Sequence, residues 1–528
     1  MTGAAPGKKR RRWPRVLFAS SGVAFTALAV RAARLPQPQG LAFRLKDELV
    51  RYGAAATGVV FVLFGLSVLV PWVFDRLEAR GFESFVAARH VRATKSGFLT
   101  VISVLSICGV AVSSCALCSV TSIMGGFGQD LKRKILGNNA QIVIDAPGVA
   151  GFDDWQSVLD RVRLVPGVTA ATPVVGGEGM ASSASNTAGA LVRGIDPTSI
   201  GNVIDLVKNL EVGKLEYLEH PERLAWLPPD EVVGLGPGGE PYVKGPDFTA
   251  PLDPAVRDAL RPARVTPGII VGRELARSLH VYVGDELTLV SPMGDLGPMG
   301  IMPRSRRFRV AAIFYSGMYE YDATHVYTTM AAANSLLSLE GKVTQIEVKL
   351  ADADRSTELA AAVREAVSRD ELRVRDWREM NKNLFSALKL EKIATFIILS
   401  IAIVVASFCI ICTLLLMVTE KGKEIAILKA LGASDAAILR VFMREGVMIG
   451  TIGTAFGVAT GLATCLGLSW FGVRLDPDVY YIDRLPIAVN ASDYVTVTLA
   501  ALAICTLSTL YPAWSASKLR PVDGLRYE

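Results

Sequence analysis

The sequence predicts an α-helical membrane protein with four core transmembrane helices and a large α+β domain between the first and the second of them. Hydrophobic residues make up 51% of the 528 residues and are concentrated in blocks. Four blocks are uncharged and long enough to cross a bilayer, which takes about 20 residues. A long polar region, about residues 130–390, separates the first block from the second. The four uncharged runs are Ser96–Gln129, Ile393–Thr419, Gly446–Val473 and Tyr494–Ser517.

Two further apolar runs precede these four. Ala54–Phe74 is long enough to span a membrane, whereas Val16–Val30 is short and is flanked by the basic sequences KKRRRWPR and RAAR. The short run has three interpretations: a short crossing, a signal-peptide-like segment with a basic start and an apolar core, or a helix on the membrane surface. We favour the crossing.

Lysine and arginine near the span ends predict the orientation, because cytoplasmic loops carry an excess of these residues. Segments 75–95, 420–445 and 518–528 are basic, whereas the loop 474–493 is acidic. We therefore place the three basic segments in the cytoplasm, and the acidic loop and the polar middle region on the far side.

The polar middle region shows the pattern of an α+β domain. QIVID, ALVRGID, ELTLVS, FRVAAIF and QIEVKL are typical of strands, and RELARSLH and STELAAAVREAVSR are typical of helices. Segment 226–267 is rich in Pro and Gly, and we expect an irregular surface insertion there.

Two long helices are expected to carry this domain. No Gly or Pro occurs between Lys342 and Lys421, so a helix over 376–419 would be about 65 Å long at 1.5 Å per residue. The charged sequence QDLKRKIL likewise extends the first span. Such helices either transmit motion across the membrane or simply tether the domain. In the third span, Gly453, Gly457 and Gly461 favour close helix packing, within the chain rather than between copies.

Several function classes find no support. The sequence has no phosphate-binding G-x-x-x-x-G-K-[ST] loop, no H-E-x-x-H and no G-x-S-x-G, and its four histidines are scattered. The basic residues form no single patch, which argues against nucleic-acid binding. All seven cysteines lie in apolar runs, where we interpret them as apolar helix residues. We expect no enzyme activity and no cofactor or metal bound by this chain, so energy must come from a partner.

The segment EKGKEIAILKALGAS, residues 420–434, lies between two membrane crossings. It is either an amphipathic helix resting on the membrane surface or a coupling helix that docks into a groove of an ATPase subunit. Ile425, Leu428 and Leu431 would form an apolar edge, and Gly432 would end the helix. Charged residues would fix the register of docking: Glu420, Lys421, Lys423, Glu424 and Lys429.

The same segment resembles the signature of the ABC-transporter permease superfamily that includes FtsX, MacB and the lipoprotein-releasing LolC/LolE proteins. FESFVAARHVRATKSGFLTVISVLSICGVAV, SIMGGFGQDLKRKILG, DPDVYYIDRLPI and TLYPAWSASKLRPVDGLRYE resemble LolC/LolE over about residues 82–528. MacB-type proteins carry a fused ATPase, and FtsX has a smaller external domain, so LolC/LolE is favoured. An FtsX-like mechanotransmission scaffold and a MacB-like efflux permease are the alternatives. Residues 1–80 have no counterpart, and Gly125 replaces the usual Asn.

The resemblance implies a MacB-like periplasmic core domain and a complex in the inner membrane. Its partners would be LolD-like subunits that use ATP, a second permease subunit (a LolC/LolE homologue or a second copy), a LolA-like periplasmic carrier, triacylated lipoproteins and membrane lipids. A "hook" that grips the carrier would comprise Pro298, Met299, Gly300 and Arg304, although the loop could be a plain long hairpin. The lipid cavity would be lined by residues that could instead face bilayer lipid: Leu117, Val120, Ile123, Met124 and Phe127.

The expected organisation follows from these observations. Residues 1–80 form an N-terminal extension with one or two hydrophobic helices, 81–97 a cytoplasmic lead-in helix, 98–123 core transmembrane helix 1, 124–392 the periplasmic domain with helical stalks, 393–419 core helix 2, 420–445 the cytoplasmic coupling-helix loop, 446–473 core helix 3, 474–493 a periplasmic loop, 494–517 core helix 4, and 518–528 a cytoplasmic tail.

Overall fold

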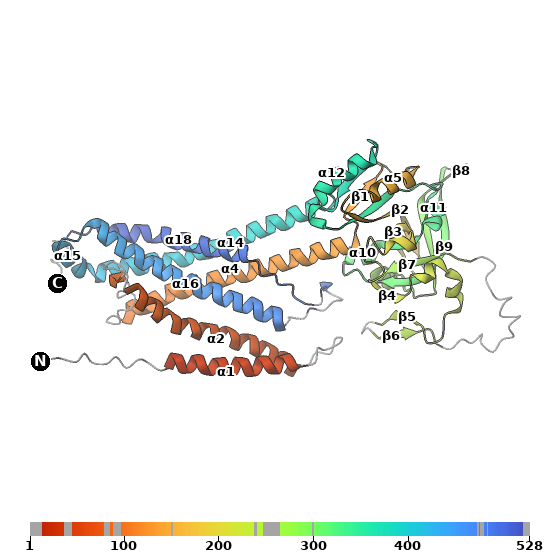
Figure 1. Cartoon of the computed structure of the whole chain (residues 1–528). Coiled ribbons are helices and arrows are strands. Elements are labelled where there is room, and N and C mark those ends of the chain that lie inside the picture. Colours follow the sequence, from red (N-terminus) through yellow and green to blue (C-terminus); the bar gives the residue numbers. More distant parts are fainter. Residues whose placement is uncertain are drawn as a thin grey trace. The chain divides into compact units, whose positions relative to one another are not determined.

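The computed structural model shown in Figure 1 divides into two compact units, which we describe separately. The helical unit comprises residues 1–129, 387–475 and 483–528, and the sheet unit comprises residues 130–386 and 476–482. The structure describes residues 13–35, 45–78, 85–87, 97–148, 151–236, 240–245, 265–297, 300–471, 475, 480–482 and 484–520. Most of the expected lead-in helix, 81–97, therefore lies outside the described residues.

Long helices follow the apolar runs of the sequence. Within the described residues, four of them are long and apolar enough to cross a membrane, which confirms the predicted class. They are α4 (Gly97–Asn138), α14 (Lys382–Glu420), α16 (Asp435–Phe471) and α18 (Ala491–Ser517), and a short helix, α15 (Gly422–Ala430), lies between α14 and α16.

The glycines of α16 pack against helices of the same chain, as predicted. A Cβ added at Gly453 would lie 2.9 Å from Val110 Cβ, and one added at Gly461 would lie 3.0 Å from Cys118 Cβ, both on α4. Gly450 similarly meets Cys505 of α18. Lipid-embedded helices gain little from hydrophobic burial, so this close backbone approach is a main source of their attraction.

The N-terminal apolar runs form two helices, α1 (Trp13–Arg34) and α2 (Leu45–Glu78), which pack together. Their described apolar stretches, Val16–Ala32 and Leu49–Gly65, are shorter than those of the four long helices. Helix formation in Val16–Val30 agrees with each interpretation given above, and a crossing by this run stays a prediction.

The sheet unit has the expected α+β composition. Its main sheet has the strand order β12-β1-β11-β2-β3-β10-β7-β9-β4, with β8 pairing with β2 and β9. The strands are β1 (Ile142–Asp145), β2 (Val168–Ser182), β3 (Thr187–Ile195), β4 (Leu210–Gly213), β7 (Gly268–Gly272), β8 (Glu286–Gly297), β9 (Gly300–Phe314), β10 (His325–Thr329), β11 (Gln345–Leu350) and β12 (Arg373–Asp376).

Helices cover this sheet, and the longer ones are α5 (Trp155–Arg163), α9 (Arg273–Leu279), α11 (Met330–Leu337) and α12 (Ser356–Val367). Glycines in the strands make room for α11. A Cβ at Gly177 of β2 would lie 2.7 Å from Leu337, and one at Gly194 of β3 would overlap Ala333. The shorter helices are α6 (Pro197–Ile200), α7 (Glu216–Glu219), α10 (Tyr319–Thr324) and α13 (Trp377–Met380).

The expected continuous helix from Asp376 is wrong in its first turn. Asp376 ends β12, and its carboxylate accepts a hydrogen bond from the Glu379 backbone N–H at 2.8 Å, which caps the separate short helix α13. Asn381 has φ −108° and ψ 20° and donates its side-chain N–H to Trp377 O at 2.8 Å. The long helix α14 therefore begins at Lys382, and its 39 residues span about 58 Å.

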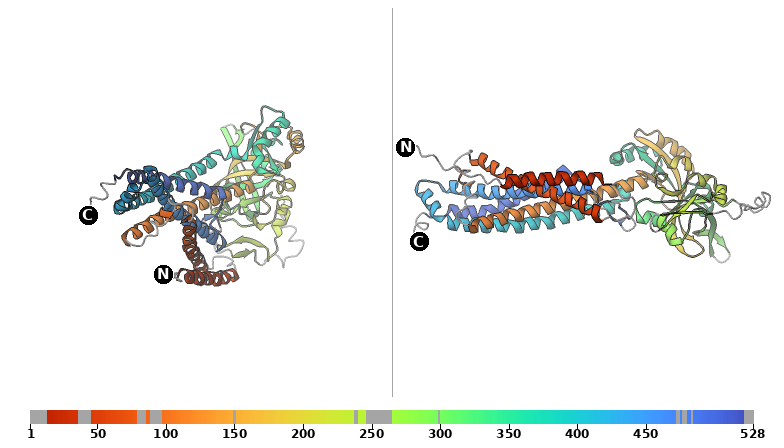
Figure 2. Two further views of the ribbon diagram at one scale, coloured as in Figure 1. Left: turned by 60° about the vertical axis from the view of Figure 1, so that its left-hand side comes forward. Right: turned by 90° about the horizontal axis from the view of Figure 1, so that it is seen from below.

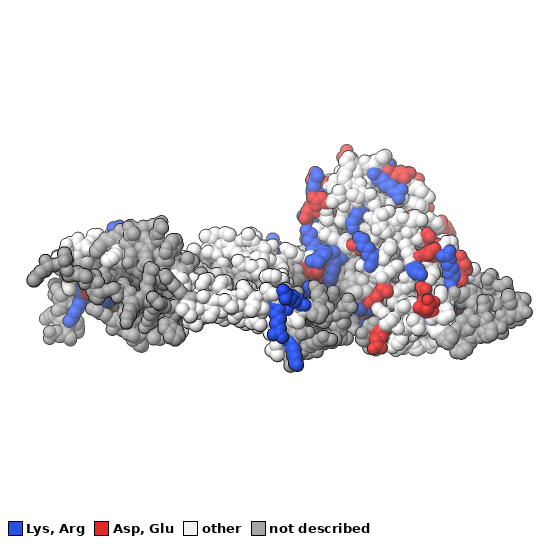
Figure 3. All heavy atoms as spheres, turned by 60° about the horizontal axis from the view of Figure 1, so that its bottom comes forward, with Lys and Arg blue, Asp and Glu red and all other residues white. Residues whose placement is uncertain are grey.

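The insertion at 226–267 is less irregular than expected. It contains a strand pair, β5 (Val232–Leu235) and β6 (Pro241–Val243), and residues 237–239 and 246–264 lie outside the described residues. Charged side chains of both signs are interspersed over the face of the sheet unit shown in Figure 3.

Candidate functional site

The segment between α14 and α16 folds as the short helix α15. Its N-terminal boundary is Lys421, and Leu431 ends the last turn. Gly432 follows with φ +99°, a left-handed conformation that glycine adopts without strain, so it ends the helix as predicted. The Ala433 backbone N–H then bonds Leu428 O at 3.0 Å.

The predicted apolar edge of α15 does not form one surface. Ile425 is only 2% exposed and packs with Leu414, Ile438 and Phe442 in the core of the helical unit. Leu428 packs against the same cluster, whereas Leu431 is 80% exposed. The prediction was wrong because Ile425 and Leu428 lie on the side of α15 that packs against α14, α16 and α18, whereas Leu431 lies outside that contact.

The exposed face of α15 differs from the predicted edge. Ile427, which sequence reasoning missed, is 50% exposed. The spacing of the exposed set was readable in the sequence, since steps of three and four residues place side chains on one helix face. The exposed residues on this face are Lys423, Glu424, Ile427 and Leu431, and the exposed Glu420 precedes them as the last residue of α14.

Lysine 429 serves the fold of the helical unit. Its Nζ lies 2.8 Å from a carboxylate oxygen of Asp435 and donates to Ser517 O at 2.7 Å and Leu519 O at 2.8 Å. Its side chain is therefore committed to joining α15 to α16 and to the end of α18. By contrast, Lys421 and Glu424 form a partly exposed pair at 2.5 Å along α15. The predicted register-fixing role thus does not extend to Lys429.

The candidate lipid-cavity residues divide into two groups. Leu117 is fully buried with Ile403 of α14 and Val497 and Ala501 of α18, so it belongs to the core of the helical unit. The assignment of Leu117 to a cavity lining is therefore wrong. The other candidates are partly exposed and lie on α4 with spacings of three and four residues: Val120, Ile123, Met124 and Phe127.

An extended segment, residues 484–490, packs beside these residues on α4. The Ala488 N–H donates to Ser122 O at 3.0 Å, and an added Cβ at Gly126 would lie 2.7 Å from Ile487 N. Gly125, the departure from the family pattern, faces Asn490, whose Nδ2 would lie 3.5 Å from an added Cβ. Asn490 thus occupies space that a longer side chain at 125 would need.

The same end of the helical unit is tied by polar contacts. Lys392 Nζ of α14 lies 2.9 Å and 3.1 Å from the two carboxylate oxygens of Asp493 on α18. Since the residues lie at the ends of their apolar runs, the pair connects α14 to α18 beside the segment that packs on α4.

The candidate hook is the end of a long hairpin formed by β8 and β9. The strands stay paired as far as Gly297 and Gly300, and Pro298 and Met299 lie outside the described residues. Arg304 of β9 donates to Ser335 O of α11 at 3.4 Å, so its side chain reaches back toward the domain. The carrier-binding role of these residues stays a prediction.

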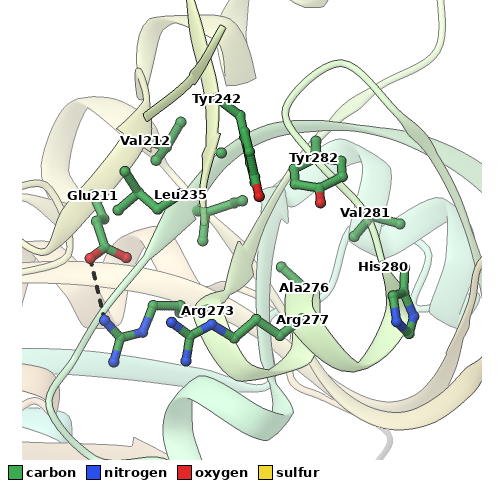
Figure 4. Close-up of a pocket in the computed structure, with 12 residues that line it drawn as sticks. Glu211, Val212, Leu235, Tyr242, Arg273, Ala276, Arg277, His280, Val281 and Tyr282 are labelled. Atoms are coloured by element: carbon green, nitrogen blue, oxygen red, sulfur yellow. Dashed lines mark hydrogen bonds and ion pairs between the residues drawn. The ribbon is translucent and has the colours of Figure 1, made fainter. Parts of the chain in front are cut away.

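A pocket of about 420 Å³ lies in the sheet unit between α9 and the β5–β6 pair (Figure 4). Arg273, held 3.4 Å from Glu211, and Arg277 line one side, and Tyr242 and Tyr282 line another. The two tyrosine rings meet edge-on, with centroids 5.9 Å apart.

Asp322 and His325 of the sheet unit have pKa values that burial shifts. Asp322 is fully buried and accepts the Ser316 backbone N–H at 2.8 Å, and burial raises the pKa of Asp322 to about 6. Burial, with the nearby Arg193, lowers the pKa of His325 to about 4. Arg193 is itself paired with the buried carboxylate of Glu347. Among the residues that the structure describes, no His, Cys, Asp and Glu side chains cluster in a way that could hold a metal ion.

The comparisons with known proteins agree with this architecture. A family model described as "FtsX-like permease C-terminal" matches residues 396–521, which include all of α15, α16 and α18 and most of α14. The lipoprotein-releasing system transmembrane protein LolC of Xylella fastidiosa is 32% identical over 453 residues, covering 84% of this chain and 98% of that protein.

Two further relatives give the same result. LolC of Neisseria meningitidis serogroup B is 31% identical and covers 84% of this chain and 99% of that protein. LolE of Haemophilus influenzae is 24% identical and covers 84% of this chain and 98% of that protein. Since two LolC proteins match over almost their full length at more than 30% identity, this chain belongs to the LolC/LolE family of lipoprotein-releasing system transmembrane proteins.

Proposed function

We propose that this chain is the permease subunit of an ATP-driven complex that extracts lipoproteins from the inner membrane and passes them to a periplasmic carrier. Family membership supports the lipoprotein substrate. A separate, LolD-like subunit supplies the ATP hydrolysis, a second permease subunit completes the complex, and a LolA-like carrier receives the cargo. The chain itself is non-catalytic.

The observation that carries the proposal is the exposed face of α15. This face combines two apolar side chains, Ile427 and Leu431, with the charged residues Lys423 and Glu424. Apolar residues surrounded by charges are typical of a helix that docks in a groove of a protein partner. Because α15 follows α14 directly and leads into α16, and packs on both through Ile425, force applied to it reaches two long helices.

Energy considerations agree with coupling to ATP. Each CH₂ group of an acyl chain removed from a bilayer costs about 0.8 kcal/mol, so extracting a lipoprotein with several long chains costs far more than thermal energy supplies. The partly exposed stripe on α4, with Val120, Ile123, Met124 and Phe127, offers apolar surface for such chains. In this proposal these four residues contact the acyl groups, and Leu117 acts only through packing.

The test replaces Leu431 by Asp. A charge at this exposed position should leave the fold intact, because Leu431 makes no part of the buried core. We expect loss of lipoprotein release from reconstituted vesicles and loss of co-purifying ATPase. Leu164→Asp is the matched control, since Leu164 is 83% exposed in the sheet unit. Leu428→Asp is unsuitable, because Leu428 packs against the core.

The outcomes separate the proposal from its alternatives. If Leu431→Asp retains the ATPase subunit and releases lipoproteins at the normal rate, the docking role of α15 is wrong. If the purified complex contains an ATPase and a periplasmic cell-wall hydrolase but no lipoprotein, a mechanotransmission scaffold replaces the permease.

A further inference from the structure

The N-terminal helices α1 and α2 form a built interface. The Phe18 and Phe61 rings stack with centroids 4.6 Å apart. An added Cβ at Gly22 of α1 would lie 2.9 Å from the Phe61 ring. In the other direction, an added Cβ at Gly58 of α2 would lie 2.9 Å from the ring of Phe25. Each helix therefore places phenylalanine rings over glycines of the other.

The pairs of this interface define its geometry. Phe18 faces Gly65, Gly22 faces Phe61, and Phe25 faces Gly58, so positions rise along α1 as they fall along α2. The two helices are thus antiparallel, as expected for a hairpin whose arms cross a membrane in opposite directions. We call the pair of helices α1 and α2 the N-terminal hairpin.

The hairpin also packs on the core helix α16, through α2. Figures 1 and 2 show α2 along α16, and the two helices are in contact. Ala54 is fully buried, and an added Cβ at Gly467 of α16 would lie 3.5 Å from Ala55 Cβ. Arg51, one turn before Ala54, is only 7% exposed. In a membrane, small residues at a helix contact, here Ala55 and Gly467, allow the close packing that holds helices together.

The matches to the two LolC proteins cover 98% and 99% of those proteins but only 84% of this chain. About a sixth of this chain therefore lies outside these matches. The core of the helical unit is built from the four long helices α4, α14, α16 and α18 without the hairpin. The hairpin is therefore not part of these two buried clusters, and it meets the core through the contact of α2 with α16.

We propose that the N-terminal hairpin is an accessory element that stays docked on the α16 flank around Gly467 of its own chain and closes this flank to a second permease subunit. The second subunit belongs to the proposed function, and it must then pack on other helices of the core. The occupant of the flank is α2 of the same chain, which brings Ala55 next to Gly467.

The test is a disulfide between Ala55→Cys and Gly467→Cys, in a chain whose seven native cysteines are replaced. The 3.5 Å separation of the two Cβ positions falls at the short end of the range for disulfides, roughly 3.5–4.5 Å. A protease site between α2 and α4 allows the hairpin to be cut from the core. Ala56→Cys with Gly467→Cys is the matched control, because Ala56 is an exposed neighbour of Ala55.

We expect the cut hairpin to stay attached to its own core by the disulfide in full complexes, and attachment to be lost in the Ala56 control. Co-expression of two differently tagged chains tests the assignment to one chain. A disulfide joining the two tags, or equal crosslinking by the control, would overturn the proposal.

The locked chain should also retain complex assembly and lipoprotein release at the unlocked rate. Loss of either on locking would show that the hairpin must leave α16, and would overturn permanent docking. The crosslink does not depend on cargo or ATP, so it can succeed or fail independently of the proposed function.

Discussion

The contact between α4 and the segment 484–490 can be tested by adding one methyl group. Replacing Gly126 with Ala places a Cβ 2.7 Å from Ile487 N and closer still to the Pro486 carbonyl. Non-bonded carbon atoms are comfortable at about 3.5–4.0 Å, so the segment must move by about 1 Å. Such overpacking costs about 1–3 kcal/mol.

Two other terms enter the free energy of unfolding. Displacement of the segment weakens the hydrogen bond from Ala488 N–H to Ser122 O, now 3.0 Å long, which is worth about 1 kcal/mol. Replacing a helical glycine by alanine returns about 1 kcal/mol through helix propensity. The net expectation for Gly126→Ala is a destabilisation of about 1–3 kcal/mol.

Gly128→Ala is the matched control, because it lies on the same helix and an added Cβ meets nothing within 4 Å. It should gain up to about 1 kcal/mol from propensity alone. The assay is thermal unfolding of the purified chain in detergent, together with maleimide labelling of a cysteine placed at Ala488. Equal melting temperatures and equal labelling rates in the two variants would refute the described packing.

Three further predictions follow from the structure. Asp322→Asn should stabilise the chain at pH 7.5, because burial raises the pKa of Asp322 to about 6. Between about pH 4 and pH 6 the native state then holds a proton that the unfolded state has lost, so the contribution of Asp322 to stability falls as pH rises, by up to about 3 kcal/mol. Unfolding at pH 4.5 and pH 7.5 measures this slope. The same variant isolates His325, whose lowered pKa, about 4, contributes stability above pH 6.5 that is lost as pH falls toward 4. A variant that retains its wild-type slope contradicts the assignment to Asp322, and a variant whose stability does not fall between pH 7.5 and pH 4.5 contradicts the assignment to His325. Gly457→Val should prevent assembly of the helical unit, since an added Cβ would lie 2.6 Å from Ser114 Cβ, and size-exclusion chromatography should show aggregation; a monodisperse variant would refute the close approach. Met124→Asp should abolish lipoprotein release while leaving ATP hydrolysis intact, and unchanged release would remove the α4 stripe from the cargo path.

The sequence predicted those features that depend on local composition. Uncharged runs longer than 20 residues mark the four long helices, and alternating apolar residues mark strands such as β11, whose bounds match QIEVKL. The strand β2 escaped prediction because Pro173, Gly176, Gly177 and Gly179 weaken a strand signal. Three of these four are glycines, and Gly177 is needed for packing against α11, a contact that no local pattern reveals.

The site was predictable only in part, for a similar reason. Spacing alone identifies faces of α15, but it does not say which face meets the rest of the chain. The burial of Ile425 and the ion pair of Lys429 with Asp435 depend on the return of α16 and α18 to the same place. The burial of Leu117 depends likewise on α14 and α18.

The most direct test of the central claim is a photo-reactive amino acid at Leu431, the most exposed apolar side chain of α15. Our account predicts that, in intact membranes, it crosslinks to an ATP-hydrolysing subunit, and that the same probe at Leu164 does not. Crosslinking at Leu431 to lipid alone, with no protein adduct at any nucleotide state, would mean that α15 rests on the membrane surface and would contradict the account.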